Sequence, residues 1–244
     1  MQWYATFTPT SKGPFIIRVS ATDVDGDTRC DATIAFAHSS NVTLTMSDEI
    51  AHLYDGLPGP RWWWIGGRVK DSNGELYDIW ITLHPGIDEY HDGDGFFLIM
   101  NKGIKVDFKG PFFVTESNGG LNITLGNCKY LIRPNGYRVI IVDTDEVKLY
   151  LETYSRGEPM IYGLGNESVQ LTTYCSIAGF DDPVTMNGIL QINGKTFQID
   201  GYGDYEHTWS FCYSPEDYQV ETWFFYNTPE VYGVVYDTIG RDNI

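Results

Sequence analysis

Two carboxyl groups and an imidazole lie close together in the segment Asp204-Tyr-Glu-His-Thr-Trp209. If the segment is extended, alternation places Asp204 and Glu206 on one face, with Cα atoms about 6.5–7 Å apart. Neighbouring carboxyl groups raise one another's pKa, so Glu206, partly buried among aromatic rings, could stay protonated as a general acid. The adjacent His207 could orient or relay the proton. We therefore predict acid/base chemistry with three catalytic candidates, Asp204, Glu206 and His207; the alternative is a solvated strand end.

Aromatic side chains could shape a binding site for an apolar molecule beside these groups. The sequence contains 7 Trp and 17 Tyr, and Trp62, Trp63 and Trp64 form a run. In a strand, Trp62 and Trp64 would point to one face and Trp63 to the other. A Trp ring can line a cavity or simply pack in the core. The ligand-binding candidates are Trp62, Trp64, Trp80, Tyr174, Tyr202, Trp209 and Trp223.

Short strands with regular turns must position these residues. Asn193-Gly194 supplies the positive φ angles of a tight hairpin turn, which predicts a hairpin over residues 188–198. Strand patterns recur along the chain, and consecutive strands of this kind favour an antiparallel meander that closes into a barrel or sandwich. They are expected at residues 15–20, 31–36, 41–46, 62–69, 76–83, 96–100, 104–108, 112–116, 121–125, 129–132, 137–142 and 147–153. One short helix, residues 47–54, is predicted with Ser47 as its cap.

Composition excludes several classes of partner. The net charge of -17 argues against nucleic acid and against electrostatic docking on anionic lipid. We expect no membrane span, because no apolar run is long enough. The N-terminus lacks a signal-peptide pattern, which predicts a cytoplasmic protein. The four cysteines lie far apart without a Cys-x-x-Cys pair, so buried free thiols are favoured over disulfides or a zinc site.

The sequence favours chemistry without a metal or cofactor. The acidic turns at residues 23–27 and 88–94 lack the full ligand set of a calcium loop, so we predict no metal. Phosphate-binding and dinucleotide-binding glycine motifs are absent, as is a Gly-x-Ser-x-Gly elbow. These absences remove support for phosphoryl transfer, nicotinamide chemistry and serine-hydrolase chemistry, and we expect no cofactor.

Three segments resemble one protein family. The stretch Arg61-Trp-Trp-Trp-Ile-Gly-Gly resembles the Glu-Trp-Trp-Tyr opening of the AttH-like proteins, which include the carotenoid 1,2-hydratases and the lipocalin-like Diels–Alderases. Residues 159–166 resemble their inter-barrel connection. Residues 186–210 resemble the hairpin that leads to their Asp-His-x-Trp motif, with Glu206 in place of the Asp and Arg61 in place of the opening Glu.

The resemblance implies an all-β, antiparallel fold of two lipocalin-like β-barrel units in tandem. The first would span residues 1–154, with an N-terminal extension of about 50 residues. Residues 155–165 would connect it to a second, shorter unit at residues 166–244. That unit would be either an open half-barrel or completed by strands from the first fifty residues. The implied ligand is a small apolar molecule of terpenoid, polyketide or lipid-like character, bound in or between the units.

The leading functional hypothesis combines the predicted acid/base residues with the ligand that the family resemblance implies. The protein would bind a small apolar molecule in an aromatic cavity and transform it by hydration, cyclisation or isomerisation, with Glu206 as acid or base. One alternative is a non-catalytic carrier of the same fold. Another is a carbohydrate-active or carbohydrate-binding β-sandwich, since aromatic platforms and paired carboxyl groups also suit sugars.

Overall fold

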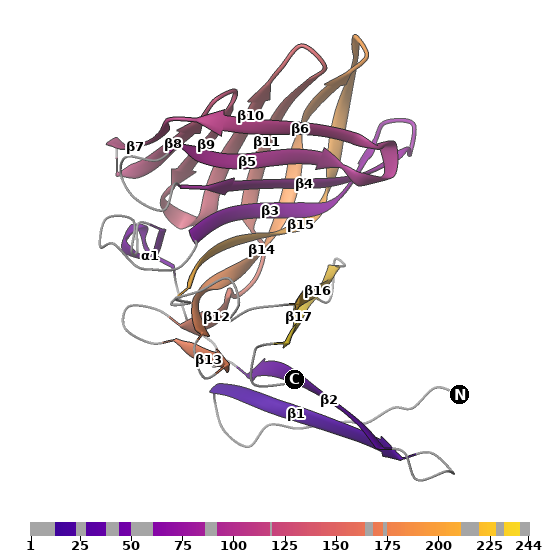
Figure 1. Ribbon diagram of the computed structural model, residues 1–244. Helices are drawn as coiled ribbons and strands as arrows, with labels where there is room; N and C mark the ends of the chain where they lie inside the picture. The colour runs from indigo at the N-terminus through magenta and orange to yellow at the C-terminus, as the bar shows by residue number, and fades with distance from the viewer. Residues whose placement is uncertain are drawn as a thin grey trace.

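The computed structural model describes residues 13–22, 28–37, 44–49, 61–85, 92–117, 119–163, 168–172, 175–210, 220–227 and 232–239. Nearly all of this chain is antiparallel β-strand, arranged in two sheets (Figure 1). The prediction of an all-β, antiparallel, lipocalin-like fold is confirmed.

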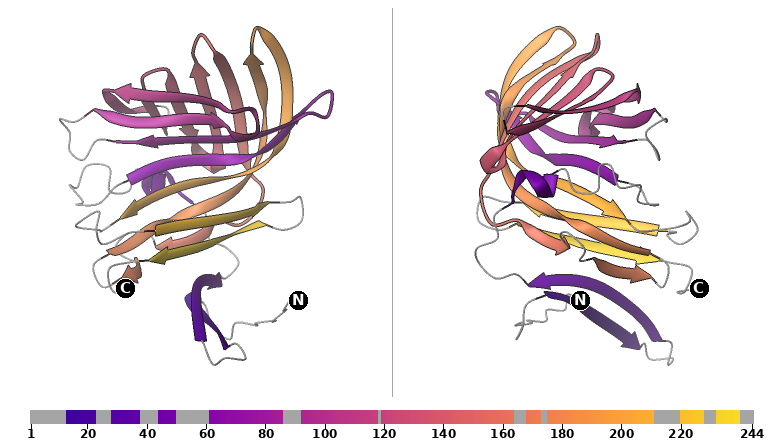
Figure 2. Two further views of the ribbon diagram at one scale, coloured as in Figure 1. Left: turned by 45° about the vertical axis from the view of Figure 1, so that its right-hand side comes forward. Right: turned by 90° about the vertical axis from the view of Figure 1, so that its left-hand side faces the viewer.

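The larger sheet contains 13 strands and curls into a nearly closed barrel (Figures 1 and 2). Its main order is β6-β5-β4-β3-β15-β14-β11-β10-β9-β8-β7, and β12 and β13 each pair with β14. Two short 3-10 turns, η1 (Met100–Lys102) and η2 (Pro134–Gly136), interrupt the meanders. The strands are β3 (Arg61–Asp71), β4 (Leu76–His84), β5 (Gly93–Ile99), β6 (Ile104–Gly110), β7 (Phe112–Ser117), β8 (Gly120–Leu125), β9 (Cys128–Arg133), β10 (Tyr137–Asp143), β11 (Val147–Ser155), β12 (Met160–Gly163), β13 (Val169–Thr172), β14 (Cys175–Ile192) and β15 (Lys195–Ser210).

The longest two strands, β14 and β15, form one hairpin in the middle of this sheet. It turns at Asn193-Gly194, whose φ angles are 52° and 73°, so the predicted turn is confirmed. β15 pairs with β3 on one side and β14 pairs with β11 on the other. The hairpin therefore joins the β3–β6 meander to the β7–β11 meander (Figure 2). The first half of β14 extends past β11 and pairs with β12 and β13.

The smaller sheet contains β1 (Gly13–Thr22), β2 (Thr28–Ala37), β16 (Val220–Asn227) and β17 (Tyr232–Ile239) in the order β1-β2-β17-β16. One register pair, Tyr236 with Ile34, links the N-terminal hairpin to the C-terminal hairpin. The N-terminal strands thus pair with C-terminal ones. The division at residues 155–165 stays a prediction; β12 lies within that segment.

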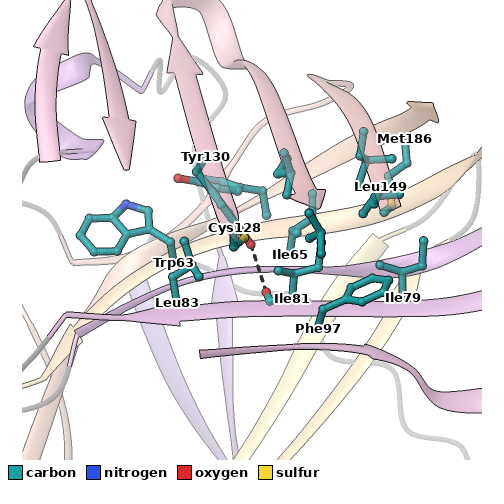
Figure 3. Packing of buried hydrophobic residues seen from close by; sticks show 14 of the residues in the cluster. Trp63, Ile65, Ile79, Ile81, Leu83, Phe97, Cys128, Tyr130, Leu149 and Met186 are labelled. Atoms are coloured by element: carbon teal, nitrogen blue, oxygen red, sulfur yellow. Dashed lines mark hydrogen bonds between the residues drawn. The ribbon is translucent and has the colours of Figure 1, made fainter. Parts of the chain in front are cut away.

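Side chains from both meanders fill the barrel interior (Figure 3). Alternation on β3 and β4 sends Trp63, Ile65 and Ile81 inward, where they are fully buried. On the opposite wall, the Tyr130 hydroxyl of β9 donates a hydrogen bond of 3.1 Å to the carbonyl oxygen of Ile81. Cys128, beside it, is a buried free thiol whose pKa is raised by burial, as the cysteine analysis predicts for this residue. The buried side chains of the interior form one hydrophobic core.

A short helix, α1 (Met46–Glu49), lies near the N-terminal end of β3 (Figure 1). Its cap is Thr45 rather than the predicted Ser47, because the Asp48 carboxylate accepts 2.7 Å hydrogen bonds from the Thr45 N–H and hydroxyl. The rest of the predicted helix lies outside the described residues. None of the helices in the described ranges is long and apolar enough to cross a membrane.

Candidate functional site

The two faces of β15 carry two different groups of buried side chains. Asp204, Glu206 and Thr208 point away from the barrel interior, whereas Tyr205 and His207 point inward. All of these residues are at most 2% exposed. The predicted alternation is therefore present, but the carboxyl groups are buried, so the interpretation as a solvated strand end is wrong.

Glu206 lies at the centre of the outer group. Its Oε1 atom accepts hydrogen bonds of 3.0 Å from the Trp62 indole N–H and 3.0 Å from the Tyr162 hydroxyl. The Thr208 hydroxyl donates a third, short bond to the same atom and also contacts the Tyr162 hydroxyl. Three donors on one oxygen offset the cost of burying a carboxylate. Burial and the neighbouring Glu206 raise the pKa of Tyr162 well above its usual value, so its hydroxyl remains a donor.

A second buried carboxyl group, Asp181 on β14, lies directly opposite Glu206 in the strand register. It is 3% exposed, and neither carboxyl oxygen has a hydrogen-bond partner among the described residues. Burial raises its pKa well above the usual value, and the charges of Glu206, Asp204 and Asp182 raise it further. Burial without hydrogen-bond donors and the negative charges around it therefore both favour the protonated form of Asp181.

Sequence reasoning missed Asp181 and Tyr162. Counting outward from the Asn193-Gly194 turn pairs Asp181 with Glu206, so the hairpin register was the available signal for Asp181. Tyr162 lies on β12, within the segment predicted to be a connection. Nothing in the local pattern of that short strand indicates that its side chain reaches Glu206.

The tryptophan residues predicted to bind ligand are divided between the faces. Trp62, Trp64 and Trp80 share the outer face with Glu206, and the Trp64 and Trp80 rings meet edge to face at 5.5 Å. Trp64 covers Gly66, where an added Cβ would collide with the indole ring. Trp62 is partly exposed, whereas Trp64 is 5% exposed. Trp62 is therefore the indole of this face that combines contact with Glu206 and access to solvent.

His207 and Trp209 lie on the inner face, away from Glu206. The His207 ring stacks on Trp63 with centroids 4.4 Å apart and an interplanar angle of 7°, and Trp209 follows at 5.3 Å. The His207 Nδ1 atom lies 3.0 Å from the carbonyl oxygen of Trp62, so this nitrogen is the N–H donor. Because adjacent residues of a strand point to opposite faces, the structure does not bring the His207 ring to the Glu206 carboxyl group.

The remaining predicted site residues lie apart. Tyr202 is on the outer face of β15 but is exposed, with the Arg156 guanidinium 5.2 Å from its ring centroid. Tyr174 and the side chain of Trp223 lie outside what the structure describes.

A buried charged network, which the sequence analysis did not find, lies next to this site. Arg138 of β10 is fully buried and donates to Asp182 at 2.7 Å and to Glu49 of α1 at 2.9 Å. Its guanidinium lies 3.7 Å from the ring centroid of Tyr205, whose hydroxyl donates to Glu49 at 2.7 Å. Burial by itself would lower the pKa of Arg138, but the negative charges of Glu49 and Asp182 have the larger effect and raise this pKa. The network links α1 to the hairpin strands.

In the described ranges, no group of three or more His, Cys, Asp or Glu side chains is arranged so that it could hold a metal ion. The acidic turn at residues 23–27 lies outside those ranges, as does most of the 88–94 loop.

Comparison with known proteins supports the fold. No protein-family model matches the sequence, and no curated protein matches it significantly. The described architecture is that of a lipocalin-like barrel. It is similar to a crystal structure from Nitrosomonas europaea of a protein provisionally described as AttH, with a TM-score of 0.64 and 13% sequence identity, over 84% of this chain and 68% of that one. At this identity the similarity shows a common fold.

Proposed function

We propose that the protein binds a small, largely apolar molecule on the outer face of the barrel sheet and transforms it by acid/base chemistry at Glu206. The observation that carries this proposal is the Glu206 carboxyl group, buried on an aromatic face with three donors on one oxygen. A buried carboxyl group beside apolar surface is suited to exchanging a proton with a bound molecule. Hydration, cyclisation and isomerisation are reactions of this kind, and none of them requires a cofactor.

The outer face is favoured over the barrel interior as the binding place. The interior is filled by side chains, and the Tyr130 hydrogen bond joins its opposite walls. On the outer face, Trp62 is partly exposed and its indole N–H already contacts Glu206. An apolar molecule that covered Trp62 would therefore also lie next to the carboxyl group.

Binding can be tested with farnesol, an isoprenoid alcohol, as the probe, by following tryptophan fluorescence. We expect saturable binding that weakens at least about tenfold in Trp62→Ala, because a large apolar contact is lost. Tyr154→Ala is the matched control, since Tyr154 is an exposed aromatic residue elsewhere on the same sheet. No saturable binding, or equal weakening in both variants, would contradict the proposed site.

Catalysis is tested by Glu206→Gln, which keeps the shape of the side chain but removes its ability to act as an acid or a base. Farnesol is incubated with the protein in D₂O, and deuterium uptake at its carbons is measured by mass spectrometry. We expect wild-type protein to promote uptake and the variant to reduce its rate by about two to four orders of magnitude while still binding. Binding without deuterium uptake in wild-type protein would favour the alternative of a non-catalytic carrier.

A further inference from the structure

Among the described residues, Asp181 is a buried group of this site whose surroundings do nothing to stabilise a charge. Its oxygens have no hydrogen-bond partner in the described part of the chain, whereas the facing Glu206 receives three donors. An ionised carboxyl group without donors is costly to bury, but a protonated one costs far less. The two carboxyl groups therefore differ in environment although they are directly paired across β14 and β15.

The groups around Asp181 reinforce this difference. On β15 it faces Glu206 and the nearby Asp204, and its own strand contributes Asp182. On the other side β12 places Met160 opposite it and brings in the Tyr162 hydroxyl, which interacts with both carboxyl groups. Asp182 is already paired with Arg138, so that cation is engaged elsewhere. Among the described residues, the charges that act on Asp181 are all negative.

We propose that Asp181 is the proton donor of the site and that Glu206 is the matching proton acceptor. This inference rests on the proposed function and deepens it, because it assigns the acid and the base to two different residues. Pairs of carboxyl groups whose environments differ in this way commonly divide the two roles. Sequence analysis left Glu206 as either acid or base, and the hydrogen-bond pattern suits it better as the base.

The proposed step balances without an oxidant or a reductant. The Asp181 O–H bond breaks and its proton goes to an alkene carbon of the bound molecule, whose π electrons form the new C–H bond. The resulting cation can then react in two ways. It can lose a proton from a neighbouring carbon to Glu206, which gives an isomer of the starting molecule. Alternatively, it can add water, and the extra proton of the added water goes to Glu206. The starting state is restored when Glu206 releases that proton to solvent and Asp181 takes up a proton from solvent.

The protonation state of Asp181 is tested on the protein without ligand by infrared spectroscopy at neutral pH. We expect a carbonyl band of a protonated carboxylic acid that disappears in Asp181→Asn. Asp200→Asn is the matched control, since Asp200 is an exposed carboxyl group on the same face of β15, and this change should leave the band in place. If Asp181→Asn removes no such band, Asp181 is ionised and the proposal is overturned.

The donor role is tested by the deuterium-uptake assay with farnesol. We expect Asp181→Asn to bind the probe within about threefold of wild type but to lose deuterium uptake by about two to four orders of magnitude. Uptake within tenfold of wild type, or loss of binding together with uptake, would overturn the donor role. If wild-type protein neither binds farnesol nor exchanges deuterium, the proposed function fails for this probe, whereas the infrared band still decides whether Asp181 holds a proton.

Discussion

Arg138 shows at the scale of a single residue how this protein holds a buried charge. Its guanidinium is enclosed by Glu49, Asp182 and the Tyr205 ring. Removal of the cation would leave two buried carboxyl groups with hydroxyl donors but without the positive charge that pairs with them. We expect Arg138→Met to lower the free energy of unfolding by about 3–5 kcal/mol, measured by urea denaturation, because breaking a buried pair from one side is strongly destabilising.

Two further variants test this explanation. The exposed ion pair between Arg68 and Asp78 is the control, and Arg68→Met should cost less than about 1 kcal/mol because solvent screens the pair. Neutralising the partners as well, in the triple variant Arg138→Met, Glu49→Gln and Asp182→Asn, should recover part of the lost stability. If the triple variant is no more stable than the single one, lost packing rather than unpaired charge explains the effect.

The same residues show how far sequence reasoning reaches into the site. Alternation along an extended strand correctly put Glu206 on the same face as Asp204, and Trp62 on the same face as Trp64. Side chains two residues apart in a strand point to the same face, whatever their partners. Asp181 and Arg138 were missed because their importance arises from partners that are distant along the chain. His207 was grouped with Glu206 on sequence adjacency, and adjacency in a strand separates two side chains.

At the scale of elements, the β14–β15 hairpin depends on a single turn. Gly194 has φ of 73° and open space around its Cα, so a side chain would meet no atom but would be forced into a left-handed backbone conformation. We expect Gly194→Ala to cost about 1–2 kcal/mol in urea denaturation. Asn193→Gly should be close to neutral, because Gly also accepts the φ of 52° at that position. Equal effects of the two changes would show that the turn conformation does not limit stability.

The strands between residues 62 and 153 were well predicted, whereas part of the central hairpin was not. Each predicted strand from residue 62 to residue 153 coincides with an observed one, because turn residues and alternation are local signals. The first half of β14 was not predicted. Its sequence around Phe180-Asp-Asp-Pro183 contains two charged residues and a proline, which are uncommon in strands. Pairing with β12 and β15 holds this segment in a strand despite its low intrinsic preference for one.

At the scale of the whole molecule, stability should depend on the ionisation of Asp181. Its pKa in the folded state lies well above the value of about 3.9 expected in an unfolded chain. Below the unfolded value the group is protonated in both states, and its contribution to stability is fully present. As pH rises through the folded pKa, that contribution is lost because the unfolded chain ionises more readily.

The Asp181→Asn variant isolates this effect. Asparagine mimics the protonated acid and does not titrate, so its stability should fall less between pH 4 and pH 8 than that of wild type. Thermal unfolding at several pH values measures the difference, which should widen as pH rises. Asp200→Asn is again the control and should follow the wild-type profile. A constant difference across this range would mean that Asp181 does not change ionisation on folding.

The position of the β14–β15 hairpin has a consequence for how the chain reaches its folded state. The β3–β6 and β7–β11 meanders are complete by Ser155, yet in the finished sheet the later hairpin lies between them. During synthesis, one edge of β3 and one edge of β11 therefore have no partner strand until residues 175–210 have left the ribosome. Pairings so distant along a chain form slowly. During that interval, the strand that carries the tryptophan run has unpaired backbone groups along one edge. Strands with such unpaired edges tend to associate with other chains.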